Sequence, residues 1–477
     1  MSTNRVARAV SARTPAYSLV SPVNGEVIDE ISLASPDQLA AVCAQIPPAA
    51  PGTPPAEVFA FLDRLSQALT RHRERMFQLT VLETGFIARD SAEMIDGSIS
   101  FLREFATFAR SQAPRQQLVR HSYSMAGDRD MRIASRPLSG VAGVVPQNAS
   151  LSLSITILAA ALYAGARVIL RPSLQGGATG ALLARLVEEA DPPSQTIWIV
   201  NSLARDFVDV SCSAEAIDLI HCIGSNRYAI PVLTQSFEAG KTCLLDGQGN
   251  GLLYVDEGFD VAEAAAIITA GATRYNGETC TSVNGVLAHP SIYGRLRDAL
   301  AASFSALRVG HPLDADVDIG PLFSEKQAGA LAESLEQHRG ASRLLCGGQR
   351  DGAYFTPSVL EKPRSDDPLV TEGLFGPVIW IAPGDEREAP AWLRRNRFPL
   401  SDTVLSHRAD VIQDLATKSR AARICLNTDP SIESMFEPWG GYPPSGMNPV
   451  SIWTEKYRQA YQLDGRLDEV LAVVSPG

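Results

Sequence analysis

The chain has 477 residues, a formal net charge of −11 at pH 7, and 45% hydrophobic residues. This length is enough for two or three domains with large apolar cores. The acidic balance argues against nucleic acid or anionic membrane as a partner, because phosphate groups select for clustered Lys and Arg. The longest apolar run, residues 155–170, is broken by Gly165 and Arg167, so we expect no membrane span. A small organic substrate is the expected partner.

Cysteine and histidine spacing argues against disulfide and metal chemistry. The seven cysteines show no CxxC pair, and the seven histidines include no HExxH motif. Scattered cysteines in a chain of this length are typical of a reducing compartment, so the expected location is the cytoplasm. No metal ligand set is predicted.

The N-terminal part has helical periodicity. Apolar residues recur at three and four spacing over residues 54–85 and Gly85 ends the pattern, so two or three helices are expected before residue 112. Residues 116–138 then alternate polar and apolar around a Gly127-Asp128 bend, which predicts a two-stranded ribbon. A ribbon this exposed is expected to pair with another element, and pairing with the C-terminal tail across subunits would cover its edge.

From Gly140 the pattern becomes that of a parallel sheet. A strand at 139–147, a helix at 152–166 and a strand at 167–173 form a βαβ unit, and further strands are expected at 196–201, 218–224 and 243–247. A helix opens at Ser225. The region up to about residue 246 is therefore predicted to be a doubly wound, nucleotide-binding domain. A second α/β half follows, with strands at 251–256, 283–290, 378–383 and 422–427 and a helix at 290–307.

The stretch TRYNGETCTS, residues 273–282, places Cys280 among small polar residues. One interpretation is a buried small hydrophobic residue, which is the usual role of a free cysteine. The other is a nucleophile, because so little bulk surrounds the sulfur that a substrate can approach it.

The segment NGETCTS resembles the nucleophile segment of the aldehyde dehydrogenase superfamily. Further stretches resemble that family in its own order: PQNAS (146–150), RPS (171–173), IGS (223–225), LLDGQGN (244–250), DIGPLFSEKQ (318–327), LFGPVI (374–379) and EPWGGYPPSG (437–446). The resemblance implies an α/β fold with a Rossmann-type cofactor domain, a catalytic domain and a small β oligomerisation element. These are expected over 1–114 with 138–246, over 247–446, and over 115–137 with 447–477, in a homodimer or homotetramer.

The resemblance also implies NAD(P)-dependent oxidation of an aldehyde to a carboxylic acid. The Cys280 thiolate would attack the carbonyl, and the resulting thiohemiacetal would be oxidised to a thioester. The side-chain amide of Asn148 and the backbone N–H of Cys280 would hold the oxyanion. Asn148 also has a simpler interpretation as a turn former after Pro146.

The expected base departs from the family pattern. Asp246 stands where the family usually has a glutamate that activates the deacylating water, and an Asp-Gly pair is also a common turn. Glu278, where the family usually has glutamine, is the substitute candidate. If neither acts, coenzyme A would take the acyl group, as in the acylating branch of the family.

The cofactor site departs as well. The resemblance assigns cofactor contacts to Pro146, Arg171, Ser173, Gly224, Ser225 and Phe375. Arg171 replaces the usual lysine, while Leu174 and Gly373 stand where relatives carry ribose-binding glutamates. A gained guanidinium and a lost acid suit a 2′-phosphate, which favours NADP over NAD.

Two alternatives from other classes remain open. The same cysteine could serve a redox-neutral thioesterase or acyltransferase, or the chain could be a binding protein with a decayed site. For the substrate, Ala149 replaces a residue that is often aromatic, and Trp439 belongs to a segment that resembles the tunnel wall of the family. Together they favour an aromatic or bulky aldehyde.

Overall fold

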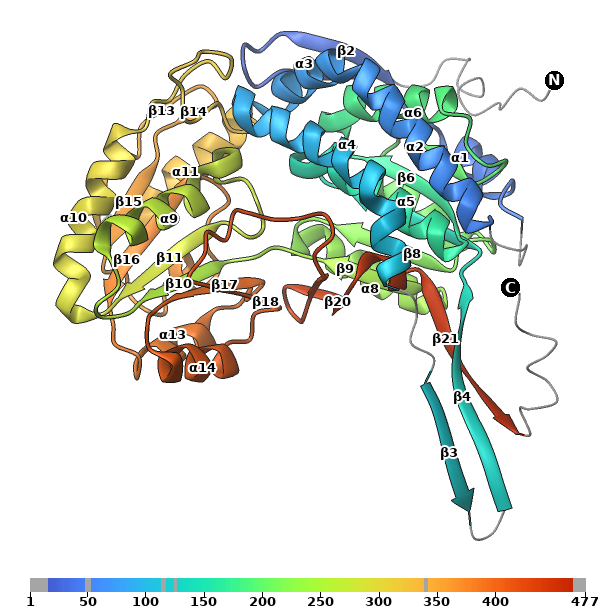
Figure 1. Ribbon diagram of the computed structural model, residues 1–477. Coiled ribbons are helices and arrows are strands. Elements are labelled where there is room, and N and C mark those ends of the chain that lie inside the picture. Colours follow the sequence, from blue (N-terminus) through green and yellow to red (C-terminus); the bar gives the residue numbers. More distant parts are fainter. Residues whose placement is uncertain (1–15, 48–52, 113–116, 124–126, 339–341, 466–477) are drawn as a thin grey trace.

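The structure is a computed structural model that describes residues 16–47, 53–112, 117–123, 127–338 and 342–465. Two lobes lie side by side, each built around a seven-stranded sheet, and a three-stranded ribbon projects from one of them (Figure 1). The alternation of strands and helices predicted from Gly140 onward is confirmed in both lobes.

Within residues 16–47 and 53–112, the structure has four helices where two or three were expected. They are α1 (Pro36–Cys43), α2 (Pro55–Arg71), α3 (Arg73–Thr84) and α4 (Ala88–Ser111), after the hairpin of β1 (Ala16–Val20) and β2 (Val27–Ser32). The additional helix, α1, is short and begins at a capping box in which Ser35 and Gln38 satisfy each other's backbone N–H groups. Gly85 takes a left-handed conformation and ends α3, as predicted.

The first sheet has the order β19-β20-β9-β8-β5-β6-β7. Its parallel strands are β5 (Gly140–Val145), β6 (Arg167–Pro172), β7 (Ile197–Ile199), β8 (Leu219–Ile223) and β9 (Thr242–Asp246). The chain runs from β5 outward to β7 and then returns to the other side of β5, so the strand order reverses between β5 and β8. The crevice at such a reversal, outside the carboxyl ends of the strands, is where doubly wound folds bind ligands.

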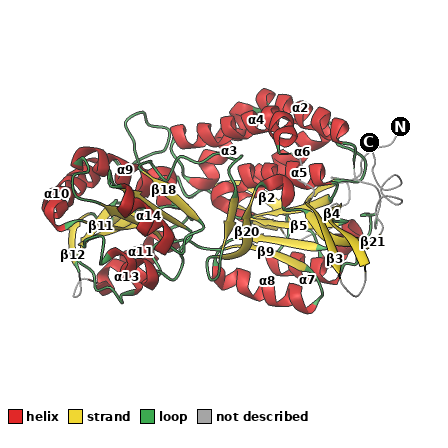
Figure 2. Ribbon diagram, turned by 60° about the horizontal axis from the view of Figure 1, so that its bottom comes forward, coloured by secondary structure: helices red, strands yellow, loops and turns green. Residues whose placement is uncertain are grey.

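Helices cover both faces of this sheet (Figure 2). On one face α5 (Ser150–Ala164) and α6 (Gly177–Glu189) pack with α2 and α4, and on the other lie α1, α7 (Ala204–Ser213) and α8 (Asn226–Glu238). Within the described residues, the segment Gln147–Ala164 is long and apolar enough to cross a membrane, and 67% of it is buried inside the protein. Here it serves as a core helix.

The second sheet has the order β12-β15-β16-β11-β10-β17-β18. Its strands are β10 (Gly251–Val255), β11 (Val283–Ala288), β12 (Arg343–Cys346), β15 (Ser358–Glu361), β16 (Val378–Pro383), β17 (Ser401–Leu405) and β18 (Arg423–Leu426). Helices α9 (Val261–Thr273) and α10 (Pro290–Ala306) cover one face. The other face carries α11 (Glu325–His338), α13 (Ala389–Arg395) and α14 (Ala409–Lys418), while the small elements β13 (Arg350–Asp351), β14 (Tyr354–Phe355) and α12 (Pro368–Thr371) lie in connections.

The ribbon consists of β3 (Gln117–Tyr123), β4 (Gly127–Pro137) and β21 (Arg458–Gly465), with β4 in the middle. Residues 124–126, between β3 and β4, lie outside the described residues, and Gly127 of the expected Gly-Asp bend is the first residue of β4. The tail was expected to meet the ribbon across subunits, but β21 pairs with β4 of its own chain, Arg458 opposite Pro137. The outer edges of β3 and β21 are what the ribbon offers to another copy.

Residues 439–451 return to the first lobe. Strands β19 (Trp439–Gly441) and β20 (Gly446–Ser451) extend the first sheet, and Gly446 pairs with Asp246 of β9. The sequence-based division placed residues up to 446 with the second lobe, because the pattern near residue 440 has no apolar periodicity. Hydrogen bonds to β9, not local sequence, place this segment.

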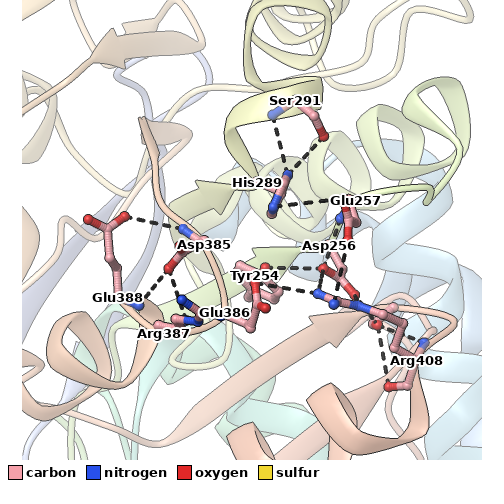
Figure 3. Close-up of polar contacts among 11 residues, drawn as sticks. Tyr254, Asp256, Glu257, His289, Ser291, Asp385, Glu386, Arg387, Glu388 and Arg408 are labelled. Atoms are coloured by element: carbon pink, nitrogen blue, oxygen red, sulfur yellow. Dashed lines mark hydrogen bonds and ion pairs between the residues drawn. The ribbon is translucent and has the colours of Figure 1, made fainter.

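An ion-pair cluster closes the carboxyl end of the second sheet (Figure 3). The strand order reverses there between β10 and β17. Asp256 follows β10 and is fully buried, and Arg408 follows β17. The guanidinium donates to both carboxylate oxygens, Nε to Oδ2 at 2.8 Å and Nη2 to Oδ1 at 2.7 Å, and Ser406 Oγ donates at 2.6 Å. Burial alone would raise the pKa of Asp256, but these donors hold the pKa below its usual range.

Candidate active site

A cavity of about 1330 Å³ lies where the strand order of the first sheet reverses. Typical small-molecule pockets measure about 300–1,000 Å³, so this one has room for a dinucleotide and a second ligand. Nearly all of the predicted site residues line it: Pro146, Asn148, Arg171, Ser173, Gly224, Ser225, Asp246, Cys280 and Phe375. Glu278 does not line it.

Cys280 is presented by an unusual left-handed turn. Tyr275, Asn276 and Gly277 have φ values of 51°, 57° and 69°. Positive φ costs a non-glycine residue about 1–2 kcal/mol, so the surroundings must hold this conformation. The Asn276 amide does so by bonding Pro321 O at 2.9 Å and Gly320 N at 2.9 Å.

Gly277 sits in a close backbone contact. A Cβ at this position would lie 2.5 Å from the carbonyl carbon of Gly376, which leaves no room for a side chain. On the other side of the thiol, a Cβ at Gly249 would lie 1.9 Å from the Cys280 oxygen. The two glycines let neighbouring backbone segments fix the position of Cys280.

The Cys280 thiol is partly exposed to the cavity. The surrounding protein removes most of its water, which raises the pKa of the thiol well above its usual range. The charges of Glu433 and Asp246 raise the pKa further, while the residue's own backbone N–H and Arg423 oppose them. The resting thiol is therefore protonated, and it must lose its proton as it attacks.

Asn148 lies in a 3₁₀ turn, Gln147–Ala149, directly after β5 and Pro146. Its Nδ2 donates to the backbone oxygen of Glu278 at 3.0 Å, which holds the amide beside the segment that carries Cys280. A side-chain amide has two N–H groups, so one remains for an oxygen in the cavity. The turn-forming and oxyanion-binding interpretations of Asn148 are thus compatible.

Asp246 ends β9 and is 2% exposed. His221 Nε2 lies 2.7 Å from its Oδ2, and the Asn448 amide contacts both carboxylate oxygens at 3.0 and 2.9 Å. Tyr457 OH lies 2.8 Å from His221 Nδ1. The buried phenol has this nitrogen as its acceptor, so the hydroxyl donates to Nδ1 and His221 donates from Nε2 to Asp246.

Lys456 completes this buried network. Its Nζ contacts Asn448 Oδ1 at 3.0 Å, so a single amide separates the ammonium from the Asp246 carboxylate. Burial lowers the pKa of Lys456 to about 8, and the charge of Asp246 opposes that shift. Asp246 is therefore the counter-charge of a buried cation. None of these partners carried a motif in the sequence.

Glu278 is turned away from the cavity and is fully buried. Its Oε1 accepts from Phe323 N at 3.1 Å, whereas its Oε2 has no partner in the described part of the chain. Burial raises the pKa of Glu278 well above its usual range. Glu278 is a buried acid, and the structure does not bring it together with Cys280 and Asn148 at the cavity wall.

The end of the cavity at the β5 and β8 reversal fits a dinucleotide pyrophosphate. Helix α8 begins here with Ser225 as its N-cap, and that hydroxyl makes no capping hydrogen bond. A Cβ built on Gly224 would meet nothing within 4 Å, so a ligand can approach the backbone closely. The first turn of a helix also presents unpaired N–H groups and a positive dipole end to an anion.

Arg171 and Gly373 are two of the positions at which the sequence departs from the family pattern of the cofactor site. Arg171 is buried, and its Nε donates to Ser202 O at 3.0 Å. Burial lowers the pKa of Arg171 to about 10, and it remains a cation at neutral pH. Gly373 has φ of 72°, and a Cβ there would lie 2.6 Å from Asn250 Oδ1, so a glutamate at this position would not fit without rearrangement.

The remaining part of the cavity is bordered by α4 and by residues 431–439. Aromatic rings dominate this wall, with the Phe101 and Phe436 centroids 4.8 Å apart and Trp439 beside them. Four carboxylates also line it: Glu93, Glu104, Glu433 and Glu437. Sequence reasoning missed these acids. Glu93 and Glu104 of α4 share one helical face with small residues that recur every three or four positions, and this pattern could have identified them. Residues 431–437 show no such periodicity.

One cavity thus combines a thiol, an amide donor and a helix end of the kind that binds pyrophosphate. The sequence profile of the aldehyde dehydrogenase family matches residues 9–463. The chain belongs to the aldehyde dehydrogenase family. It is an oxidoreductase that acts on aldehydes with NAD or NADP.

Individual relatives match this chain over most of its length. A sulfoacetaldehyde dehydrogenase from Neptuniibacter caesariensis is 27% identical over 402 residues, covering 82% of this chain and 85% of the relative. A vanillin dehydrogenase from Corynebacterium glutamicum is also 27% identical, covering 83% and 82%. The structure of an NAD-dependent aldehyde dehydrogenase from Sinorhizobium meliloti superposes with a TM-score of 0.87 at 24% identity, over 95% of this chain and 92% of that one. The predicted fold class is confirmed.

Proposed function

We propose that this enzyme oxidises a neutral aromatic aldehyde to the carboxylic acid, with Cys280 as nucleophile and Asn148 as oxyanion donor. The supporting observation is that the thiol, the amide and the start of α8 open into one cavity. Glu278, outside that cavity, has no part in the proposed reaction, and Asp246 is placed as a buried counter-charge.

The residues divide the reaction between them. The Cys280 thiol releases its proton to solvent in the cavity as the sulfur attacks the carbonyl carbon, and the carbonyl oxygen gains the negative charge. The second N–H of Asn148 and the backbone N–H of Cys280 stabilise that charge, each donor contributing about 3–4 kcal/mol in comparable sites. A nicotinamide cofactor would supply the hydride acceptor for this oxidation, and Cys280 would then hold the acyl group as a thioester. Ser225 and the first turn of α8 would hold the pyrophosphate.

The aldehyde is proposed to be aromatic and uncharged. Phe436 and Trp439 offer flat apolar surface to a ring, and the buried Phe101 packs behind Phe436. Among the described residues that line the cavity, Arg171 is the one cation, and it lies at the cofactor end. An anionic aldehyde would therefore meet carboxylates and no cation. The vanillin dehydrogenase relative is consistent with this class, and the sulfoacetaldehyde dehydrogenase relative is not.

NADP is proposed in preference to NAD. Arg171 supplies a cation, and Leu174 and Gly373 remove the acids that grip a free ribose hydroxyl. The enzyme is also proposed to form a homodimer or homotetramer, which the open outer edges of the ribbon support. A cytoplasmic location is proposed because all seven cysteines are free. Light scattering on the purified chain measures the number of subunits.

The test is turnover with a panel of benzaldehydes and short aliphatic aldehydes, each with NAD and NADP. We expect reduced nicotinamide and the acid product with the aromatic panel, and a higher kcat/KM with NADP. Cys280→Ala is expected to abolish turnover while the thermal unfolding midpoint stays unchanged, because the thiol is partly exposed. Turnover that persists in Cys280→Ala would refute the mechanism. Product in the absence of any nicotinamide would instead indicate a thioesterase or acyltransferase.

A further inference from the structure

Release of the acyl group by water requires a base, and neither expected acid is placed for it. Asp246 is 2% exposed, and both of its oxygens already accept hydrogen bonds from Asn448. Protonating it would leave the Lys456 ammonium without its counter-charge. Glu278 is buried outside the cavity wall.

Glu433 is a third carboxylate, and it opens directly into the cavity. Its side chain is 37% exposed, and it belongs to the segment that borders the aldehyde end. Arg423 Nη1 lies 3.4 Å from Glu433 Oε1 and 2.7 Å from Pro430 O, while Nη2 donates to Ile432 O at 2.9 Å. One guanidinium thus holds both the loop and the carboxylate in place, and the carboxylate keeps oxygen lone pairs free for water.

Glu433 is also electrostatically close to the nucleophile. Among the charges that act on the Cys280 thiol, Glu433 has the largest effect and Asp246 the next. The side chain of Thr281, which follows Cys280 in sequence, interacts with the Glu433 carboxylate. Burial raises the pKa of Glu433, with Arg423 and Thr281 opposing the shift. A carboxylate whose pKa moves toward neutrality is a better base for water than an ordinary one.

We propose that Glu433 is the general base that releases the acyl group from Cys280. This proposal builds on the proposed oxidation. The carboxylate takes one proton from a water molecule as the water oxygen bonds to the thioester carbon. The tetrahedral centre then collapses, the C–S bond breaks, and the electron pair returns to sulfur. The free acid and the Cys280 thiolate result, and the proton on Glu433 returns to the thiolate or to solvent.

Glu437 offers a matched control. It lines the same cavity, its side chain is 38% exposed, and its Oε2 lies 3.6 Å from Arg423 Nη2. Glu433→Gln and Glu437→Gln therefore each remove one negative charge from the same cavity wall. Each also removes one ion pair of Arg423. They differ in contact with the segment of Cys280, because Thr281 interacts with Glu433.

The experiment is rapid mixing of each full-length variant with NADP and an aromatic aldehyde that the wild type oxidises, followed by intact mass measurement. We expect Glu433→Gln to form one equivalent of reduced cofactor and then stall, with the steady-state rate at least 100-fold lower, since general bases contribute about 10²–10⁴-fold. The stalled protein should carry the acyl mass on Cys280. Glu437→Gln and Asp246→Asn should keep turning over within a few-fold of the wild type. Hydroxylamine should restore turnover in Glu433→Gln, because it attacks a thioester without a base.

The outcomes separate the two proposals. If neither the wild type nor any variant forms reduced cofactor, the proposed oxidation itself is rejected. Steady turnover in Glu433→Gln, or a stall in Asp246→Asn alone, would overturn the role of Glu433. A first turnover lost in Glu433→Gln would also overturn the assignment to acyl release, because Cys280 attack would then need this carboxylate. In the wild type, the acid limb of kcat should follow the raised pKa of Glu433, and this limb should be absent from the residual rate of Glu433→Gln.

Discussion

The two seven-stranded sheets share an architecture and differ at the edge where ligands bind in such folds. In the first sheet the strand order reverses between β5 and β8, and a large cavity opens there. In the second it reverses between β10 and β17, and Asp256 with Arg408 occupies that edge. Both edges carry polar residues after buried strands, so polarity alone does not mark a site.

Hydrogen-bond satisfaction separates the two edges. Asp256 is bonded by Arg408, Ser406 and Tyr254, and no oxygen of it is left for a ligand. At the first edge Ser225 makes no capping bond and Asn148 keeps an N–H unused. A reversal point thus becomes a binding site when its polar groups are held in position without being consumed.

The largest expected effect comes from opening the closed edge. Arg408→Met leaves the buried Asp256 carboxylate without its partner, which costs about 3 kcal/mol of unfolding free energy, the lower end for a buried pair because Arg408 is 34% exposed. The kcat of the folded enzyme should not change, because this edge lies away from the cavity. Urea unfolding and steady-state kinetics check the two parts, and a large loss of kcat would show that the edges communicate.

The same variant has a signed pH dependence. In the wild type the pKa of Asp256 is below its usual range, so its stabilising contribution is present above about pH 4, the unfolded pKa, and is lost as pH falls through the lower folded value. Without Arg408, burial raises the pKa of Asp256, and the variant loses stability as pH rises through that range. The stability gap between the two proteins should therefore widen from pH 4 to pH 7.

The next effect sharpens the description of the open edge. Arg171→Gln removes the one cation among the described residues that line the cavity. If the proposed cofactor role holds, the kcat/KM ratio of NADP to NAD should fall about 10-fold, or about 1.4 kcal/mol, as for a lost charge-assisted hydrogen bond. Arg171→Lys keeps the charge and is the matched control. An unchanged ratio in Arg171→Gln would remove Arg171 from cofactor selection.

The smallest effect tests the polar chain beneath the open edge. Tyr457→Phe leaves His221 Nδ1 without its donor and should lower the unfolding free energy by about 1 kcal/mol. Asp246 is proposed to act as a counter-charge and not as the base. The kcat of Tyr457→Phe should therefore stay within about three-fold of the wild-type value. A selective loss of kcat at unchanged stability would return Asp246 to the chemistry.

Local patterns predicted the elements whose signals are local. The βαβ unit from Gly140 shows alternating periods of strand and helix, and the cysteine segment has its own composition. Pro146, Ser173 and Gly224 meet at one cavity because each follows a parallel strand of the first sheet, and these strands end at the same edge. Strand β17 was missed because Ser401, Asp402 and Thr403 are polar residues buried inside it.

Long-range contacts were not predictable from the sequence. Asp246 gains its role from His221, 25 residues away, and from Asn448, 202 residues away. Glu433 lies in a segment without periodicity, and its relation to Cys280 depends on how the loop after β18 is tied by Arg423. Such side-chain neighbourhoods arise from tertiary packing, which a single sequence does not display.

The left-handed turn at 275–277 has a mechanical consequence. The backbone of Gly277 packs closely against that of Gly376, and Gly376 directly follows Phe375, which lines the cavity. Displacing one of these backbones displaces the other, so the sulfur and the wall share a common reference point. In the proposed reaction this contact would keep the reacting carbon aligned with its hydride acceptor, so even an alanine at position 277 should disturb turnover.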